Sequence, residues 1–138
     1  MLWGSSVGLP SYELQSGGLL SERYDPSQGK PSEGRFALFP FYVDRYWKDN
    51  YLVAAERIGK ACERAGIHPA RAALRWMVHH WALDASRGDE VITGASRRAQ
   101  LNENLAACTE PPLPAAVLDA CGEAWEIARP HCPKYFRP

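Results

Sequence analysis

The sequence predicts an α/β protein that is mainly helical when taken as an isolated chain. Four apolar stripes with helical spacing lie after residue 50, and prolines or glycines bound them. Only one run is typical of a β-strand, and it lies between two of these helices. The helix–strand–helix order is the repeating unit of α/β proteins, but one short strand cannot form a sheet alone. Either further strands come from elsewhere, or the 138 residues are part of something larger.

The first fifty residues are expected to be loop, with one strand or a single helical turn. They contain turn signals and no sustained helical period. The turn signals are Gly17-Gly18, Asp25-Pro26, Lys30-Pro31 and Gly34.

Two helices are expected next. Over residues 52–65, apolar positions recur at three- and four-residue steps, and Gly66 follows them as a glycine follows a helix end. The helix over 69–81 begins with a proline, which suits a first turn. His79 and His80 lie near its end, where the helix dipole favours cations, so a structural role is expected for both.

A short β-type run, Val91–Thr93, follows a polar break and ends at Gly94. The third helix is expected over 98–107, with Leu101 and Leu105 on one face.

The fourth helix is expected from Pro114 to Ala128, and Pro130 and Pro133 prevent its continuation. Three tryptophans on the helical stripes are expected to be core residues: Trp76, Trp81 and Trp125.

The composition excludes several classes of function. Sixteen Lys and Arg balance sixteen Asp and Glu, whereas a nucleic-acid binder normally carries a basic surplus. No run approaches the ~18 apolar residues of a membrane span, and the first residues lack the parts of a secretory signal. Four cysteines are too few for a disulfide scaffold, and they contain no C-x-x-C pair, which weakens a zinc interpretation. A cytoplasmic domain without nucleic acid, membrane or metal is therefore expected.

The junction between the predicted strand and the third helix combines groups that bind anions. Gly94 is followed by Ser96, expected at the helix N-cap, and by Arg97 and Arg98 in the first helical turn. A helix N-terminus presents unpaired N–H groups and a partial positive charge. The three side chains would add a hydroxyl and two guanidinium groups, and such a set suits phosphate.

Two amides follow on the same helix. Gln100 and Asn104 lie one turn apart, so both could face the same bound group. The alternative is that Ser96 is a simple N-cap and that the two arginines beside it are solvated. The spacing alone leaves both interpretations open.

Further motifs stand in a fixed order along the chain. They are Gly17-Gly-Leu-Leu-Ser-Glu-Arg-Tyr, Gly34-Arg-Phe, Tyr42-Val-Asp-Arg-Tyr-Trp, Ala73-Leu-Arg-Trp-Met-Val-His-His, Val91-Ile-Thr-Gly-Ala-Ser, Gln100-Leu-Asn-Glu-Asn-Leu and Cys132-Pro-Lys-Tyr-Phe-Arg. Together they resemble the C-terminal part of the aldo-keto reductases, nearest the aflatoxin-aldehyde reductase group. The resemblance runs from about Ser16 to Arg137, so residues 16–138 are expected to be the C-terminal part of such a domain and residues 1–15 an unmatched N-terminal segment.

The resemblance implies a (β/α)8 TIM barrel, with NADPH lying across the C-terminal ends of its strands. NADPH would deliver hydride to an aldehyde or a ketone. Because such a barrel needs about 250 residues, the chain would be a C-terminal fragment of it. The family's catalytic Asp, Tyr, Lys and His come from the first half of the barrel, so no catalytic residue is expected in this chain.

The resemblance also implies binding residues. Those expected near the cofactor's pyrophosphate are Gly17, Gly18, Leu19, Leu20, Ser21 and Arg23, with Arg35 as a further cofactor-binding arginine. Those expected at the adenosine end are Ser96 and Arg97, nearest the 2′-phosphate, and Gln100 and Asn104, toward the adenine. Those expected to contact a small carbonyl substrate are Tyr42, Arg45 and Arg137.

Two functions from different classes remain open. One is an NADP(H)-dependent aldo-keto reductase, of which this chain is the cofactor-clamping part. The other is a catalytically inactive remnant or a non-enzymatic interaction module. Without barrel strands, the apolar faces of the helices over 69–81 and 98–107 would stay exposed, so an oligomer formed through this apolar surface is also expected.

Overall fold

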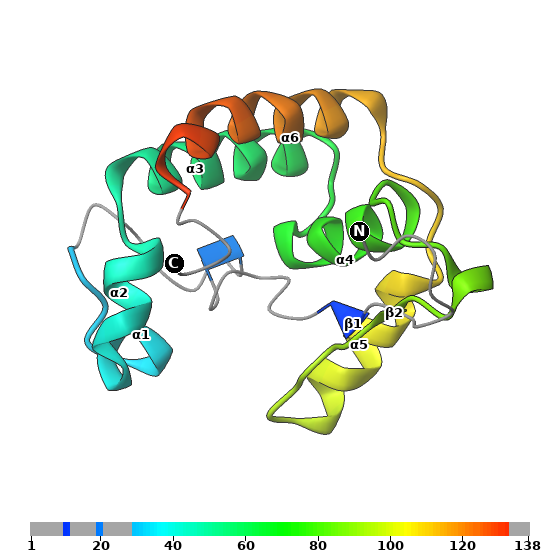
Figure 1. The fold of residues 1–138 in the computed structure, drawn as a ribbon, viewed down its shortest axis with the longest axis horizontal. Helices are drawn as coiled ribbons and strands as arrows, with labels where there is room; N and C mark the ends of the chain where they lie inside the picture. Colours follow the sequence, from blue (N-terminus) through cyan, green and yellow to red (C-terminus); the bar gives the residue numbers. More distant parts are fainter. Residues whose placement is uncertain (1–9, 12–18, 21–28, 133–138) are drawn as a thin grey trace. The chain divides into compact units, whose positions relative to one another are not determined.

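A computed structural model describes residues 10–11, 19–20 and 29–132, and most of them are helical (Figure 1). The helices are α1 (Gly34–Leu38), α2 (Pro40–Tyr46), α3 (Asp49–Arg64), α4 (Pro69–His79), α5 (Arg98–Cys108) and α6 (Ala115–Ala128), with the short 3-10 helices η3 (Ala85–Arg87) and η4 (Arg129–His131). The strands are β1 (Pro10–Ser11) and β2 (Glu90–Val91). The prediction of a mainly helical chain is confirmed.

The described residues fall into two compact units. The β2–α5 unit contains residues 10–11 and 71–113, and the α3–α6 unit contains residues 19–20, 29–70 and 114–132. The chain passes from one unit to the other within the first residues of α4, and it passes back at the bond between Leu113 and Pro114.

Helices α3 and α6 pack side by side and form the core of the α3–α6 unit (Figure 1). Their buried side chains are small: Ala54 and Cys62 on α3, and Val117, Ala120 and Ala124 on α6. Small side chains let two helices approach closely. At the edge of this contact Arg57 of α3 forms an ion pair with Glu123 of α6. Both helices occupy the stretches that their apolar periods predict.

Two short helices, α1 and α2, lie in the region for which the sequence predicts loop with one strand or a single helical turn, so that prediction is wrong for residues 34–46. Aromatic packing, rather than a helical apolar period, stabilises them. The buried ring of Phe36 lies edge-on to Trp47, with 5.2 Å between centroids, and to Tyr42, at 6.4 Å. Pro40 at the first position of α2 also fixes the backbone angle that a helix start requires.

Strand β2 pairs in parallel with β1, so that Pro10 lies opposite Glu90 and Ser11 opposite Val91. The sequence predicts this strand over Val91–Thr93, whereas the structure has it over Glu90–Val91, so the predicted bounds are wrong by one residue at the start and two at the end. Parallel pairing requires a long crossover connection, which the residues between the two strands supply. The order α4, β2, α5 is the helix–strand–helix order that the sequence predicts.

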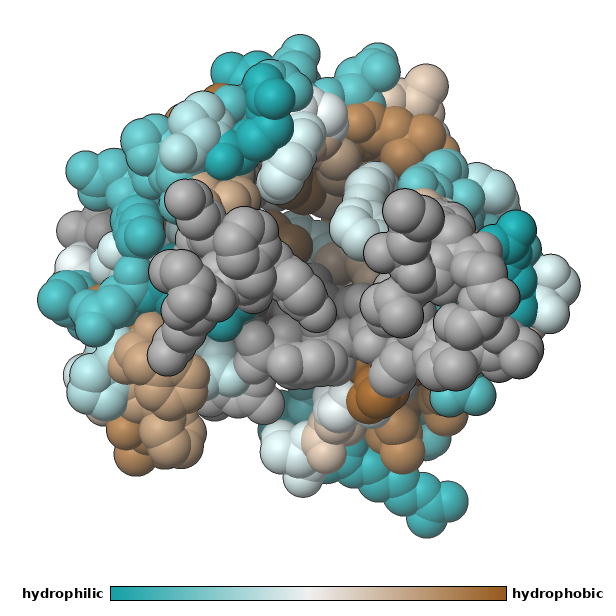
Figure 2. Space-filling model, in the orientation of Figure 1, coloured by the Kyte–Doolittle hydropathy of each residue, from teal (hydrophilic) through white to brown (hydrophobic). Residues whose placement is uncertain are grey.

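Large apolar side chains are exposed on both units (Figure 2). They are Val78, Trp81, Ile92, Leu101 and Leu105 in the β2–α5 unit, and Leu38, Phe39, Phe41, Val53 and Trp125 in the α3–α6 unit. The prediction that Trp81 and Trp125 are core residues is wrong, since they are 48 % and 52 % exposed, whereas Trp76 is half-buried against Trp81. No helix in the described part of the chain is both long and apolar enough to cross a lipid bilayer.

Candidate functional site

The turn between β2 and α5 spans residues 92–97, and its last four residues are exposed. Helix α5 begins at Arg98, preceded by Arg97 in an extended conformation with no side-chain cap. The prediction that Ser96 caps the helix is therefore wrong, because the extended backbone of Arg97 moves the helix start one residue along the chain. The Ser96 hydroxyl caps nothing and has no partner among the residues that the structure describes.

Two amides on α5 hold this turn. Asn104 Nδ2 donates to Thr93 Oγ1 at 2.9 Å and to the Gly94 carbonyl oxygen at 3.4 Å. One helical turn earlier, Gln100 Oε1 accepts from the Ser96 backbone N–H at 3.4 Å. The structure thus places Gln100 and Asn104 on one face of α5, as predicted, and both amides contact the turn itself.

Thr93 is a residue of this site that the sequence interpretation missed. It follows the strand, and its partner Asn104 is only 7 % exposed on the buried face of α5. A buried amide needs hydrogen-bond partners. An asparagine on the inner face of a helix and a hydroxyl residue just after the preceding strand were therefore the available signal.

Replacing Asn104 with leucine is expected to loosen the turn. Leucine has a similar size but donates no hydrogen bond, so Thr93 Oγ1 and the Gly94 carbonyl lose their donor. The free energy of unfolding should fall by about 1–3 kcal/mol, and the Ser96 amide should exchange faster with solvent. Urea unfolding and NMR hydrogen exchange measure the two effects.

Thr93 supplies the matched variants for this test. Thr93→Ser keeps the accepting hydroxyl and should behave as the parent chain, whereas Thr93→Val should destabilise. If Thr93→Val is as destabilising in the Asn104→Leu background as alone, the two side chains do not interact. The hydrogen bond between Asn104 and Thr93 then does not stabilise the turn.

The start of α5 carries positive charge that no ion pair within the described ranges offsets. Arg97 and Arg98 are both exposed, and the first turn of α5 contains no acidic residue. Guanidinium groups next to the positive end of a helix are unfavourable, so an anion bound there would stabilise them. Free backbone N–H groups and the Ser96 hydroxyl would donate to the same anion. This arrangement can bind a phosphate group.

The other predicted binding residues that the structure describes belong to the α3–α6 unit. Arg35 lies in α1, and Tyr42 and Arg45 lie in α2. Tyr42 is buried in the aromatic cluster, whereas Arg45 is exposed, with its guanidinium 5.3 Å from the ring centre of Tyr46. Leu19 and Leu20 are half-buried. Outside the described residues lie Gly17, Gly18, Ser21, Arg23 and Arg137.

Tyr51 of α3 bonds the backbone of η4. Its hydroxyl donates to the His131 carbonyl oxygen at 2.9 Å. Burial, together with a hydrogen bond to the Cys132 thiol, raises the pKa of Tyr51 to about 12.

Burial also raises the pKa of the Cys108 and Cys121 thiols. A protonated thiol is a poor nucleophile, so burial makes these two cysteines less reactive than a free thiol. Within the described ranges no group of three metal-ligating side chains lies together.

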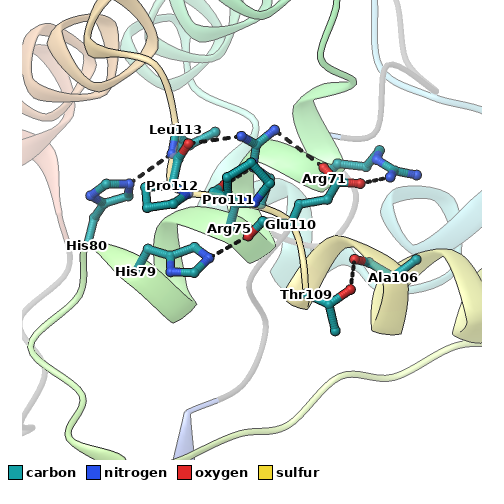
Figure 3. Close-up of polar contacts among 10 residues, drawn as sticks. All are labelled: Arg71, Arg75, His79, His80, Ala106, Thr109, Glu110, Pro111, Pro112 and Leu113. Atoms are coloured by element: carbon teal, nitrogen blue, oxygen red, sulfur yellow. Dashed lines mark hydrogen bonds and ion pairs between the residues drawn. The ribbon is translucent and has the colours of Figure 1, made fainter.

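Arg75 of α4 ties this helix to residues 110–113, which we call the α5–α6 connector (Figure 3). The Arg75 residue is 6 % exposed, and its Nε and Nη2 donate to the carbonyl oxygens of Pro111 at 2.9 Å and Pro112 at 3.0 Å. Its Nη1 lies 3.3 Å from the Glu110 carboxylate. The buried charge is thereby paired and hydrogen-bonded, as a buried charge must be. Nothing in the sequence pattern singles out Arg75.

The same connector is bonded by two further residues of α4, Arg71 and His79, and by His80, which directly follows the helix (Figure 3). Arg71 pairs with the Glu110 carboxylate. His79 Nε2 lies 2.7 Å from the Glu110 carbonyl oxygen, and His80 Nε2 lies 3.1 Å from the Leu113 backbone nitrogen. The structural role predicted for both histidines is confirmed.

Comparison with known proteins gives one consistent result. The model of the Aldo/keto reductase family matches residues 3–126. The chain is 40% identical over 136 residues to Aflatoxin B1 aldehyde reductase member 2 of Rattus norvegicus, and the match covers 92% of this chain and 37% of the relative. It is 40% identical over 131 residues to Aldo-keto reductase family 7 member A3 of Homo sapiens, over 88% of this chain and 40% of the relative.

The chain spans about two fifths of the length of these curated relatives. The family match covers most of the chain and includes α1 to α5 and the turn before α5. The chain therefore belongs to the aldo/keto reductase family of oxidoreductases.

Proposed function

We propose that this chain carries the part of an aldo-keto reductase that binds the adenosine end of NADPH, in a cytoplasmic enzyme that reduces an aldehyde or a ketone. In this proposal residues 16–138 are the C-terminal part of a (β/α)8 barrel. The rest of the barrel and the catalytic residues would belong to the portion of the relatives that the chain does not span.

The observation that carries the proposal is the turn before α5. Ser96, Arg97 and Arg98 are exposed there, and none has a side-chain partner within the described ranges. Gln100 and Asn104 hold the backbone of the same turn. Such a turn presents its hydroxyl and guanidinium groups without first having to order the backbone, which favours tight binding.

These residues fit the 2′-phosphate of NADPH. In the proposal Ser96 and Arg97 contact the phosphate oxygens, Arg98 adds positive charge, and Gln100 and Asn104 lie toward the adenine. A phosphate close to dianionic favours NADP(H) over NAD(H), because only the former carries this group. When bound, the nicotinamide supplies the hydride that reduces the carbonyl carbon.

The remaining assignments follow the family resemblance. Toward the pyrophosphate we place Gly17, Gly18, Leu19, Leu20, Ser21, Arg23 and Arg35. Toward the small carbonyl substrate we place Tyr42, Arg45 and Arg137. The exposed guanidinium of Arg45 supports this role, since a planar donor group suits a carbonyl or carboxylate oxygen.

The exposed apolar side chains support a second candidate, an inactive remnant that acts as an interaction module. Trp81, Leu101 and Leu105 are exposed on the β2–α5 unit. Exposed apolar surface favours association, so in this case the chain would form an oligomer through these side chains. An interaction module has no reason to discriminate between nucleotides, and this separates the two candidates.

Titration of the chain with adenosine nucleotides tests the proposal. Adenosine 2′,5′-bisphosphate is expected to bind at least about tenfold more tightly than adenosine 5′-monophosphate, since one charge-assisted contact contributes roughly 1.5–3 kcal/mol. Adenosine 3′,5′-bisphosphate has the same charge in another place and serves as the matched control. Equal affinity for all three, or binding of none, would favour the interaction module.

A further inference from the structure

The two histidines at the end of α4 bond the α5–α6 connector in opposite senses. The Glu110 carbonyl oxygen can only accept, so His79 Nε2 must carry a proton. The Leu113 backbone N–H can only donate, so His80 Nε2 must present a lone pair. His79 therefore keeps its bond whether the ring is neutral or protonated, whereas His80 keeps its bond only as the neutral ring protonated at Nδ1.

The bond to His80 uses the only backbone donor of a proline-rich stretch. Residues 111, 112 and 114 are prolines, which have no N–H, so Leu113 has the one amide donor between residues 111 and 114. The Leu113 side chain is buried, and the bond to its N–H is partly buried. If this amide loses its acceptor, neither neighbouring residue can replace it with a bond of its own.

The same peptide group is bonded on its other side (Figure 3). Its carbonyl belongs to Pro112 and accepts from Arg75 Nη2 at 3.0 Å, while its N–H donates to His80 at 3.1 Å. A cationic donor on the carbonyl polarises the peptide and makes its N–H a stronger donor. The peptide therefore binds a neutral, accepting His80 well and a protonated His80 not at all.

The charged groups that bond the same connector as His80 come from two elements. Helix α4 contributes Arg71, Arg75 and the neighbouring ring of His79, with 6.2 Å between the two ring centres. The connector contributes Glu110, whose carboxylate is engaged by both arginines. Within the described ranges, the carboxylate of this network is already matched by two guanidinium groups, so it offers little compensation for a third cation.

We propose that His80 is a proton-sensitive latch on the α5–α6 connector. The neutral ring holds the Leu113 amide, and protonation of Nε2 replaces this hydrogen bond with two opposed N–H groups. The released residue stands next to Pro114, where the chain passes from the β2–α5 unit to the α3–α6 unit. The bonds of Arg75 to Pro111 and Pro112 do not involve His80, so protonation of His80 frees the end of the connector while its start stays bound to α4.

NMR on the 15N-labelled chain tests the latch. Long-range ring correlations at pH 7.5 should show His80 protonated at Nδ1 and His79 protonated at Nε2. The hydrogen-exchange protection of the Leu113 amide should fall about tenfold between pH 7.5 and 5.5, across the range in which histidines titrate. Protection is compared after correction for the intrinsic pH dependence of exchange.

Two variants make the test specific. His80→Gln offers a carbonyl acceptor that does not titrate, so the Leu113 protection should become independent of pH. His79→Gln keeps a donor for Glu110 and should leave the wild-type pH dependence unchanged. A proton on His80 Nε2 at pH 7.5 would overturn the proposal even if neither variant folds. A pH dependence that persists in His80→Gln or disappears in His79→Gln would also overturn it.

Discussion

Replacing Arg75 with alanine is expected to lower the free energy of unfolding by about 3 kcal/mol or more. The Arg75 residue is 6 % exposed and donates to two carbonyl oxygens of the α5–α6 connector. Its removal leaves these acceptors without their donor, opens space in the buried part of the β2–α5 unit, and takes one cation from Glu110. Urea unfolding followed by circular dichroism measures the change.

Arg71 is the matched control, since it pairs with the same carboxylate but its side chain is 39% exposed. Partly exposed ion pairs contribute little, so Arg71→Ala should cost below about 1 kcal/mol. Arg75→Lys keeps the charge but loses the planar arrangement of donors, and it should fall between the two alanine variants. Equal costs for Arg75→Ala and Arg71→Ala would show that the connector does not depend on the buried guanidinium.

Replacing Arg97 and Arg98 together with alanine is expected to abolish the preference for 2′-phosphorylated nucleotides. Each charge-assisted contact contributes about 1–3 kcal/mol, so affinity for adenosine 2′,5′-bisphosphate should fall by at least tenfold. Affinity for adenosine 5′-monophosphate should change little, because this ligand has no group at the 2′ position. Titration calorimetry at low ionic strength measures both affinities, and added salt should weaken the parent chain's preference.

Arg87 provides the control for this double substitution. It is another exposed arginine of the β2–α5 unit, and it pairs with Asp84 at 3.3 Å. Arg87→Ala removes a positive charge without touching the turn before α5, so the nucleotide preference should remain. A loss of preference in this variant would assign the effect to net charge, and a preference retained in the double variant would place the phosphate elsewhere.

The fold elements that could be predicted are those with a local physical cause. The apolar periods behind α3 to α6, with prolines and glycines at their ends, place these helices within a few residues of where they lie. Helices α1 and α2 could not be predicted in this way, because Phe36, Tyr42 and Trp47 stabilise them through contacts that leave no helical period. Trp81 and Trp125 show the converse, since a residue on an apolar stripe is buried only where a partner covers it.

At the candidate site, the residue types and their order predict which residues lie together, but they do not predict which atoms of those residues form hydrogen bonds. The glycine, serine and arginine sequence correctly marks the start of a helix, yet the extended backbone of Arg97 removes Ser96 from the capping position. Gln100 and Asn104 share a face because helical spacing requires it. Which atoms these two amides bond depends on the backbone path of the turn. That path also brings the Thr93 hydroxyl within hydrogen-bond distance of Asn104. The structural role of Arg75 depends on the carbonyl oxygens of a proline-rich stretch that is distant in sequence. A local sequence pattern does not show that these groups meet.

The parallel pair of β1 and β2 has a consequence for the order of folding. Pro10 pairs with Glu90, so two paired residues close a loop of about eighty residues. This closure costs on the order of 4 kcal/mol of chain entropy, whereas each helix forms from contacts between near neighbours in sequence. During synthesis on a ribosome β1 emerges long before β2, so this pair can form only after helices α1 to α4 have been made. Because the described pair is only two residues long, we expect it to open early when the chain is destabilised.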